Sequence, residues 1–432
     1  MGPTGQKRAA YLTLAISALV LIALLISGIV FLGKVPANAV ISASEGATVT
    51  RAARSYTDDG WYMADSEGWV FRMSAEGEEL ARLKVGENAT VQTLSTDPNL
   101  GFALVLDDRY NLCRLTERET EEGLVLESEV LRSFPGGYVA MTADEDFVYF
   151  AVEASRYKQF VKYDKDDLGA DAPLARGEMY TCSRQSGGDT YLFELEISTS
   201  IVNMDTDGEF LYVVTDTGAY HKMSTDFSLN RFSFMTEEEL SALGAEMDSA
   251  TAAVTLPGDR YDSSLYRTVR SQNIAKGAAF DREAGTFFVA TAAGEFIRMD
   301  TNFRADEDSI IALPEVPATG AMVLHPESGR VYVAYDTISA VTAIDTGRNR
   351  VLYQADTAFY ISSMVAPAGG EQLLVICSGN DRDNPEVRQL LSVEIELQGR
   401  RDLNRSLGVA FCAAAAVCAV VCLFAALCCW KK

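Results

Sequence analysis

The sequence predicts an all-β fold, a seven-bladed β-propeller flanked by two transmembrane α-helices. Three features of the 432-residue chain lead to this prediction. A hairpin-like phrase recurs seven times, and its copies are spaced like the blades of a propeller. In addition, an uncharged apolar segment of membrane-spanning length lies near each end of the chain.

The hairpin phrase is clearest in "GRVYVAYDTISAVTAIDTGRNRVL", residues 329–352. Apolar and polar positions alternate in two runs, and a small turn separates them. Such alternation, in residues that are mostly β-branched or aromatic, is typical of strands half buried against a neighbour. The second run ends in an apolar residue followed by Asp, here Ile344 and Asp345.

Seven copies of this phrase can be aligned by their closing apolar residues, which are Met73, Leu115, Tyr163, Met223, Met299, Ile344 and Val393. Successive copies lie 42, 48, 60, 76, 45 and 49 positions apart. Four-stranded propeller blades repeat about every 40 to 50 residues. Four intervals therefore fit one blade each, and insertions at about 165–200 and 227–277 lengthen the other two. We expect each hairpin to be the middle pair of a blade, with the interval supplying the outer strand and the next inner strand.

The two ends of the repeat region predict how the ring closes. The last hairpin ends near Leu397, about nine residues before the second apolar segment, so no residues remain for its outer strand. Two strand candidates precede the first hairpin, at Ala39–Ser44 and Ala47–Arg54. We predict that Ala39–Ser44 pairs with the strand around Leu391–Leu397 and completes the last blade, which removes an exposed strand edge. The other candidate is expected to be the inner strand of the first blade.

The repeats resemble known propeller repeats. Residues 331–352 resemble a YVTN-type repeat, and residues 60–80 resemble NHL and quinoprotein-type repeats. The resemblance extends from about residue 48 to residue 397 and implies a β-propeller of residues 39–399. The WD dipeptide of WD-repeat proteins and the Trp-ended phrase of quinoprotein blades are both absent from the sequence. We therefore expect no quinone and no other cofactor.

Two apolar segments predict membrane helices. Tyr11–Gly33 and Ser406–Trp430 contain 23 and 25 residues without a charge, and about 20 apolar residues span a bilayer as a helix. The first segment could also be a signal peptide, because "ANA" follows it, but cleavable signals have a shorter apolar core. Basic residues in the tail of residues 1–10 and at the very end of the chain predict that both termini are cytoplasmic. The propeller is then extracytoplasmic, at the cell (plasma) membrane.

Small residues on the second span suggest that the two helices pack together. Gly408, Cys412 and Ala416 recur at four-residue spacing, and small residues let membrane helices approach closely. Ala414, Cys418 and Cys422 form a second such row. The alternative is that these alanines and cysteines face lipid.

Composition limits the partners. The chain has 61 acidic and 37 basic residues, a formal net charge of -24, which disfavours nucleic acid because its phosphates are repelled. The expected partners are the membrane and other membrane or envelope proteins. Three cysteines lie outside the predicted spans, Cys113, Cys182 and Cys377. They form no metal-binding spacing and are expected to be small hydrophobes of the β core, although one disulfide among them stays open.

The insertions carry the candidate sites. The first begins with Asp164, Asp166, Asp167 and Asp171, which are candidate calcium ligands because hard cations bind clustered carboxylates. The spacing departs from an EF-hand loop, and a solvated turn is the alternative.

The second insertion contains a capping box, Thr236 with Glu239, which predicts a short helix at Glu237–Met247. The partner-binding candidates lie on that helix and in the following loop, and they are Leu240, Leu243, Met247, Tyr261 and Tyr266.

No catalytic motif surrounds either histidine, His221 or His325, so no catalytic residue is assigned and the protein is not expected to be an enzyme. The predicted function is a membrane-tethered extracytoplasmic scaffold that binds proteins. One alternative is an accessory or truncated subunit of a bacterial transporter permease. Another is a propeller hydrolase or lyase with acidic residues converging on the central channel.

Overall fold

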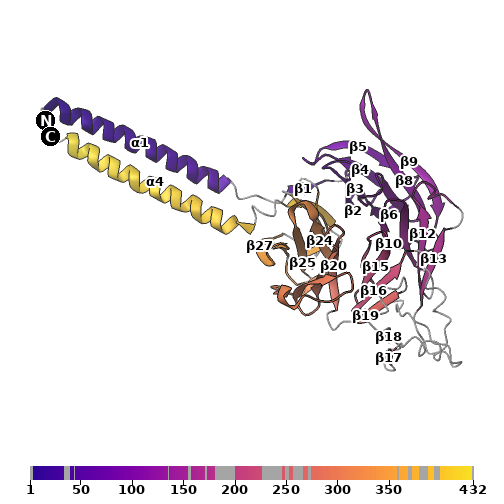
Figure 1. Cartoon of the computed structure of the whole chain (residues 1–432). Helices are drawn as coiled ribbons and strands as arrows, with labels where there is room; N and C mark the ends of the chain where they lie inside the picture. The colour runs from indigo at the N-terminus through magenta and orange to yellow at the C-terminus, as the bar shows by residue number, and fades with distance from the viewer. Residues whose placement is uncertain are drawn as a thin grey trace.

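The computed structural model describes residues 3–33, 39–42, 44–134, 136–153, 157–170, 173–180, 200–225, 246–248, 253–255, 266–270, 274–335, 337–357, 360–367, 372–378, 388–393 and 399–430. In this part of the chain seven antiparallel sheets of four strands form a ring, and two long helices project from it (Figure 1). The predicted seven-bladed propeller is therefore confirmed. The first strands of most successive blades contact one another around the centre of the ring.

From the inner to the outer strand, blade 1 consists of β2 (Val49–Arg54), β3 (Trp61–Asp65), β4 (Trp69–Met73) and β5 (Glu79–Lys84), and blade 2 of β6 (Val91–Ser95), β7 (Ala103–Asp107), β8 (Asn111–Thr120) and β9 (Gly123–Ser133). Blade 3 consists in the same order of β10 (Tyr138–Ala143), β11 (Phe147–Glu153), β12 (Tyr157–Asp164) and β13 (Ala175–Tyr180). Blade 4 consists of β14 (Ile201–Thr206), β15 (Phe210–Thr215), β16 (Ala219–Ser224) and β19 (Tyr266–Arg270). Blade 5 consists of β20 (Ala275–Asp281), β21 (Thr286–Thr291), β22 (Glu295–Asp300) and β23 (Ile311–Ala312). Blade 6 consists of β24 (Pro317–His325), β25 (Arg330–Tyr335), β26 (Ala340–Asp345) and β27 (Arg350–Asp356). Blade 7 consists of β28 (Tyr360–Val365), β29 (Leu373–Ser378), β30 (Arg388–Val393) and β1 (Ala39–Ile41). Each recurring hairpin of the sequence is the middle pair of a blade, as predicted.

The first strand of the chain closes the ring. β1 pairs antiparallel with β30, and Val40 lies opposite Leu391. The predicted closure is confirmed: β1 pairs with Leu390–Ser392 of β30, and residues 394–398 lie outside the described residues.

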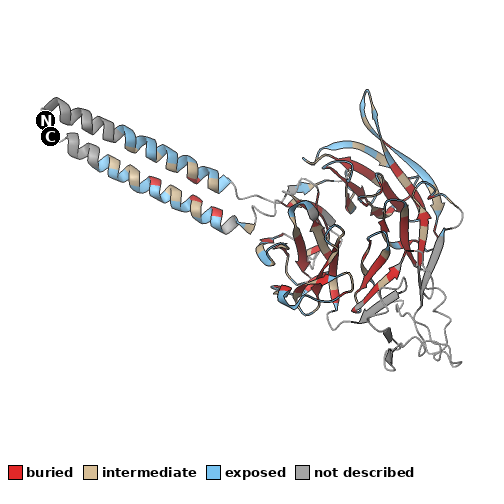
Figure 2. Cartoon of the chain, in the orientation of Figure 1, coloured by how far each residue is buried: buried red, intermediate tan, exposed pale blue. Residues whose placement is uncertain are grey.

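The middle strands of the blades are buried on both faces, because each sheet packs between two others (Figure 2). In β25, Val331, Val333 and Tyr335 pack toward blade 5, whereas Tyr332 and Ala334 pack toward blade 7. The alternation seen in the sequence thus separates two apolar faces rather than an apolar from a polar face.

Two helices form a stalk on the ring. α1 (Pro3–Gly33) and α4 (Arg401–Trp430) lie side by side along their length, with both ends of the chain at the far end of the stalk (Figure 1). Both helices are long and apolar enough to cross a membrane, by length and composition. Each is longer than the uncharged segment predicted from the sequence.

The chain enters and leaves the propeller at one edge of blade 7. Strands alternate in direction within blade 7, so the end of β30 and the start of β1 lie at the same edge as the end of the inner strand β28. The stalk itself projects sideways from the outer rim of the ring (Figure 1).

Candidate functional site: the central channel

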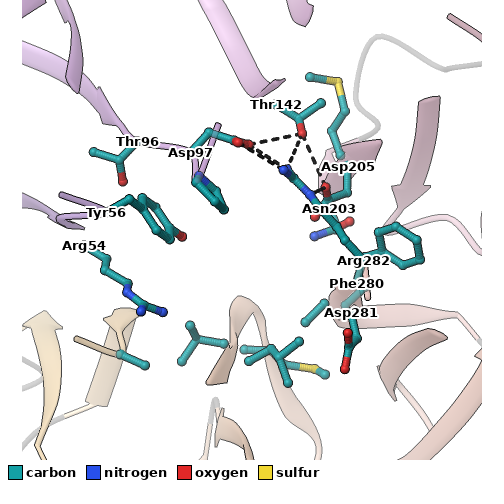
Figure 3. Close-up of a pocket in the computed structure, with 18 of the residues that line it drawn as sticks. Arg54, Tyr56, Thr96, Asp97, Thr142, Asn203, Asp205, Phe280, Asp281 and Arg282 are labelled. Atoms are coloured by element: carbon teal, nitrogen blue, oxygen red, sulfur yellow. Dashed lines mark hydrogen bonds and ion pairs between the residues drawn. The ribbon is translucent and has the colours of Figure 1, made fainter. Parts of the chain in front are cut away.

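A cavity of about 630 Å³ lies at the centre of the ring (Figure 3). All seven blades line it through the second half of their inner strands or the residues that follow. Its rim includes the exposed residues Tyr56, Pro98 and Glu283, each of which comes just after an inner strand. The cavity therefore opens on the face of the ring where the inner strands have their carboxyl ends.

Arg282 spans the polar side of this channel. It follows β20 of blade 5, and its two terminal nitrogens donate to both carboxylate oxygens of Asp97, at 3.0 and 2.6 Å. One of them also donates to the carbonyl of Ala143, at 3.1 Å, and the other to the Thr142 hydroxyl, at 2.9 Å. Asp97 is 6% exposed and also accepts the Asn99 and Ala143 amides. This carboxylate is therefore fully engaged by donors from blades 2, 3 and 5.

Asp205 is the second carboxylate on Arg282. The Nε of Arg282 donates to Asp205 Oδ1 at 2.6 Å, and the Thr206 amide donates to the same oxygen at 2.9 Å. Burial raises the pKa of Asp205 to about 6; the Arg282 charge lowers it and the nearby Asp97 charge raises it further. Burial lowers the pKa of Arg282, but the two carboxylates outweigh it and leave the pKa above its usual range. One guanidinium thus serves two acids, and the group keeps a net negative charge when both are ionised.

Arg54 lies on another side of the channel, at the end of β2. It forms an ion pair with Glu327 of the 3-10 turn η4 (Pro326–Ser328), so blade 1 is tied to blade 6. Its guanidinium also lies 5.0 Å from the ring centre of Tyr56. The positive charge of Arg54 is therefore neutralised at the rim.

Blades 6 and 7 supply an apolar wall. Met322 and Leu324 lie two apart on β24, and Met364 and Val365 end β28. The channel consequently has an apolar side facing a polar side built by blades 2 to 5 (Figure 3). Cavities of this size that combine an apolar lining with a few polar groups are typical ligand sites.

The hydrolase alternative requires carboxylates that converge on the channel, and Asp97 and Asp205 do so. However, Arg282 occupies both oxygens of Asp97, which leaves this carboxylate poorly placed to transfer a proton. Among the described residues no group of three or more His, Cys, Asp or Glu side chains is arranged to hold a metal. The geometry is that of an internal ion pair beside a cavity.

The helix-packing candidates lie in the stalk. A Cβ placed on Gly28 would lie 2.6 Å from the Sγ of Cys412, and one placed on Gly408 would lie 2.7 Å from Leu32. Phe31 stacks on Phe411 with ring centres 5.5 Å apart. Gly408 and Cys412 therefore lie between the helices.

Of the row of small residues at four-residue spacing, Gly408 and Cys412 lie in the contact between α1 and α4, whereas the third residue, Ala416, does not. Ala416 is exposed, and the adjacent Ala415 is 1% exposed. Each four-residue step advances by about 40° around a helix of 3.6 residues per turn, so a strict row drifts off the contact. Of the second row, Ala414 is exposed, whereas Cys418 and Cys422 are half-buried.

The calcium candidates are placed only in part. The carboxylate of Asp164 accepts the amide of Asp166 at 2.8 Å, and the Asp167 amide donates to the Asp164 carbonyl at 3.2 Å, which is the pattern of a capped turn. Asp171 lies outside the described residues.

The structure describes two of the five partner-binding candidates. Met247 lies in strand β17 (Glu246–Asp248), which pairs with β18 (Ala253–Thr255), so the predicted helix does not extend to Met247. A nearby strand partner outweighed the local helix signal there. Tyr266 begins β19, opposite Met223. Leu240, Leu243 and Tyr261 lie outside the described residues.

Cys113 and Cys377 are buried, as expected of core residues, and Cys182 lies outside the described residues. The sequence reasoning missed the channel group of Asp97, Asp205 and Arg282. One signal could have found them: each is a charged residue at or just after the end of an expected inner strand. In a closed ring, such positions converge on the axis.

No protein-family model and no curated protein matches the sequence. Solved structures do match it. The β-propeller domain of Cps50 (Swd1) from Myceliophteria thermophila is similar with a TM-score of 0.52 and 8% identity, over 83% of this chain and 100% of that one. Raptor from Chaetomium thermophilum is similar with a TM-score of 0.51 and 11% identity, over 80% of this chain and 28% of its own. At such identities the similarity shows a shared β-propeller fold.

Proposed function

We propose that this chain is a membrane-tethered scaffold whose extracytoplasmic propeller binds other proteins of the same membrane or envelope. Propellers in general serve as protein-binding scaffolds, and this one is joined to a stalk of two helices, α1 and α4, that lie side by side. The proposal is for a binding module rather than an enzyme, because Arg282 engages both oxygens of Asp97, one of the two carboxylates that converge on it in the channel.

One observation carries the tether. The stalk has small residues inside and large apolar residues outside: Gly28, Gly408 and Ala415 are buried, whereas Leu19, Ile29, Val420 and Phe424 are 63–71% exposed. Such a surface is unfavourable in water, at about 25 cal/mol for each Å² of apolar surface, and is favourable in a bilayer. Basic residues at the far end of the stalk support cytoplasmic termini.

Membrane fractionation with protease protection tests the tether and its orientation. The full chain should stay with the lipid during flotation after alkaline carbonate treatment. Protease added to the outside of intact cells or spheroplasts should cut the propeller and leave a tag on either terminus intact. Release by carbonate, or cleavage of the terminal tags from outside, would contradict the proposal.

In-cell crosslinking followed by purification in mild detergent tests the scaffold function. A defined set of membrane or envelope proteins should be recovered with the full chain and lost when residues 39–399 are removed and the helices are kept. Recovery of the chain alone under several mild conditions would refute the scaffold function while leaving the tether intact.

A further inference from the structure

We propose that the central channel binds a basic side chain, lysine or arginine, that a partner protein inserts from the face of the ring on which the inner strands end. This inference rests on the proposed scaffold function and names what its channel recognises. Four observations support it: the charge balance of the lining, two acceptor oxygens, an apolar wall, and the position of the opening.

The lining has an excess of negative charge. Four acidic residues, Asp97, Asp205, Asp281 and Glu283, face two basic ones, Arg54 and Arg282. Arg54 is neutralised by Glu327, and both nitrogens of the Arg282 fork bind Asp97. A further positive charge would complete the compensation of this group, and a negative one would be repelled.

Two acceptors on one strand have capacity for a donor. Asn203 and Asp205 are two residues apart on β14, so their side chains lie on the same face of the strand. The Oδ1 of Asn203 is buried without a hydrogen-bond partner, and among the described residues no donor reaches Oδ2 of Asp205. A buried acceptor without a partner is unfavourable by about 1–3 kcal/mol. An ammonium or guanidinium group has the donors that these oxygens lack.

The opposite wall suits the stem of such a side chain. Met322, Leu324 and Met364 line the channel from blades 6 and 7. Lysine and arginine bury their methylene stems against apolar surface while the charged head remains in a polar region. A ligand that is apolar along its length and cationic at its tip therefore matches both sides of the channel (Figure 3).

The position of the opening indicates the direction of approach. The exposed rim residues Tyr56, Pro98 and Glu283 each come just after an inner strand. The partner's side chain would therefore enter from the face of the ring on which the inner strands end.

The test measures binding of four short peptides to the full chain in detergent by isothermal titration. The peptides are identical except for a central lysine, arginine, norleucine or glutamate; norleucine keeps the stem and lacks the charge. The lysine or arginine peptide should bind at least about tenfold more tightly than the norleucine peptide, and the glutamate peptide most weakly. Equal binding of all four peptides, or preference for glutamate, would overturn the inference.

Two channel variants and one control locate the binding. Asn203→Leu should weaken the lysine peptide by about fivefold or more without lowering the melting temperature, because Asn203 Oδ1 makes no hydrogen bond within the protein. Leu324→Lys should abolish binding by placing a cation in the channel. Leu80→Lys on the outer strand β5, where Leu80 is 42% exposed, makes the same change away from the channel and should bind normally. If both channel variants bind as well as the unmodified chain, the site is elsewhere.

The crosslinked partners separate this inference from the scaffold function. Loss of partners in Leu324→Lys, but not in Leu80→Lys, supports both. Retention of the partners in Leu324→Lys refutes the channel as the docking point and leaves the scaffold function standing. Peptide binding without any recovered partner would support the channel as a site for basic side chains and refute the scaffold function.

Discussion

Arg282 binds Asp97 through both terminal nitrogens of its guanidinium, although the two residues lie 185 positions apart in the chain. The contact joins blade 5 to blade 2 across the channel, whereas most contacts in a propeller join neighbouring blades. It therefore connects two blades that are not neighbours in the ring.

Removal of this arginine should strongly destabilise the propeller. Arg282→Met keeps the stem and leaves Asp97, which is 6% exposed, without its counter-charge. Breaking one side of a buried ion pair typically costs about 3–5 kcal/mol. Urea unfolding followed by tryptophan fluorescence measures the change. The matched control is Arg298→Met, because Arg298 and Asp306 form a surface pair, 39% and 45% exposed, and such pairs contribute about 0–1 kcal/mol. Equal effects of the two variants on the free energy of unfolding would show that the channel ion pair contributes no more to stability than a surface ion pair.

Asp205 should make stability depend on pH in the direction opposite to an ordinary paired carboxylate. Its folded-state pKa, about 6, lies above the usual value of 3.8, so the folded protein holds the proton more tightly than the unfolded chain. The contribution of Asp205 is fully present below about pH 4 and is lost as the pH rises through about 6, by up to about 3 kcal/mol.

The comparison that isolates this effect is the unmodified chain against Asp205→Asn, unfolded in urea at pH 5, 6, 7 and 8. Subtracting the unfolding free energy of one protein from that of the other at each pH removes the contributions of the many other acidic residues. The difference in unfolding free energy should favour Asp205→Asn increasingly as the pH rises from 5 to 8. A difference that stays constant with pH would show that Asp205 titrates in the same range in both states.

The fold could be predicted because it is repeated. The alternation in residues 329–352 is a local signal, and seven copies at blade spacing make it a signal about the whole chain. Ring closure by β1 followed from counting: the last copy lacked room for a fourth strand.

The channel group could not be predicted in the same way. Asp97, Asp205 and Arg282 come from three blades, and no spacing in the sequence relates them. They meet only because the ring brings the ends of its inner strands together, so the closed geometry is needed first. The helix expected to end at Met247 failed for a related reason, since β18 offers a pairing partner that a local capping box does not take into account.

The closing strand should contribute measurably to stability. Deletion of residues 39–44 removes β1 and its three residue pairs with β30. Each lost backbone hydrogen bond is worth about 1 kcal/mol, so we expect a loss of about 2–4 kcal/mol in urea unfolding. Val40→Lys is the control, because the Val40 side chain is 56% exposed and points away from the pairing; it should change stability by less than about 0.5 kcal/mol. An unchanged unfolding midpoint after the deletion would contradict closure by β1.

Gly28 and Gly33 of α1 provide a matched test of the stalk. A Cβ added at Gly28 would lie 2.6 Å from the Sγ of Cys412, whereas nothing lies within 4 Å of a Cβ added at Gly33. Gly28→Ile should therefore separate the helices, and Gly33→Ile should leave them together. Both changes add the same β-branched side chain to the same helix, so the added hydrophobic surface is the same.

Disulfide formation between paired cysteines at positions 31 and 411 reports the separation of the helices, because Phe31 and Phe411 stack with ring centres 5.5 Å apart. The measurement uses a background in which the native cysteines of α4 are serine, with oxidation in detergent followed by a gel-mobility shift. Crosslinking in Gly33→Ile should match that of the same cysteine pair without either glycine change, and it should be reduced by about tenfold in Gly28→Ile, because a displacement of about 1–2 Å is large against the narrow range of Cβ separations that a disulfide allows. Equal crosslinking in the two variants would mean that α1 and α4 do not meet at Gly28, and the close-packed stalk would have to be abandoned.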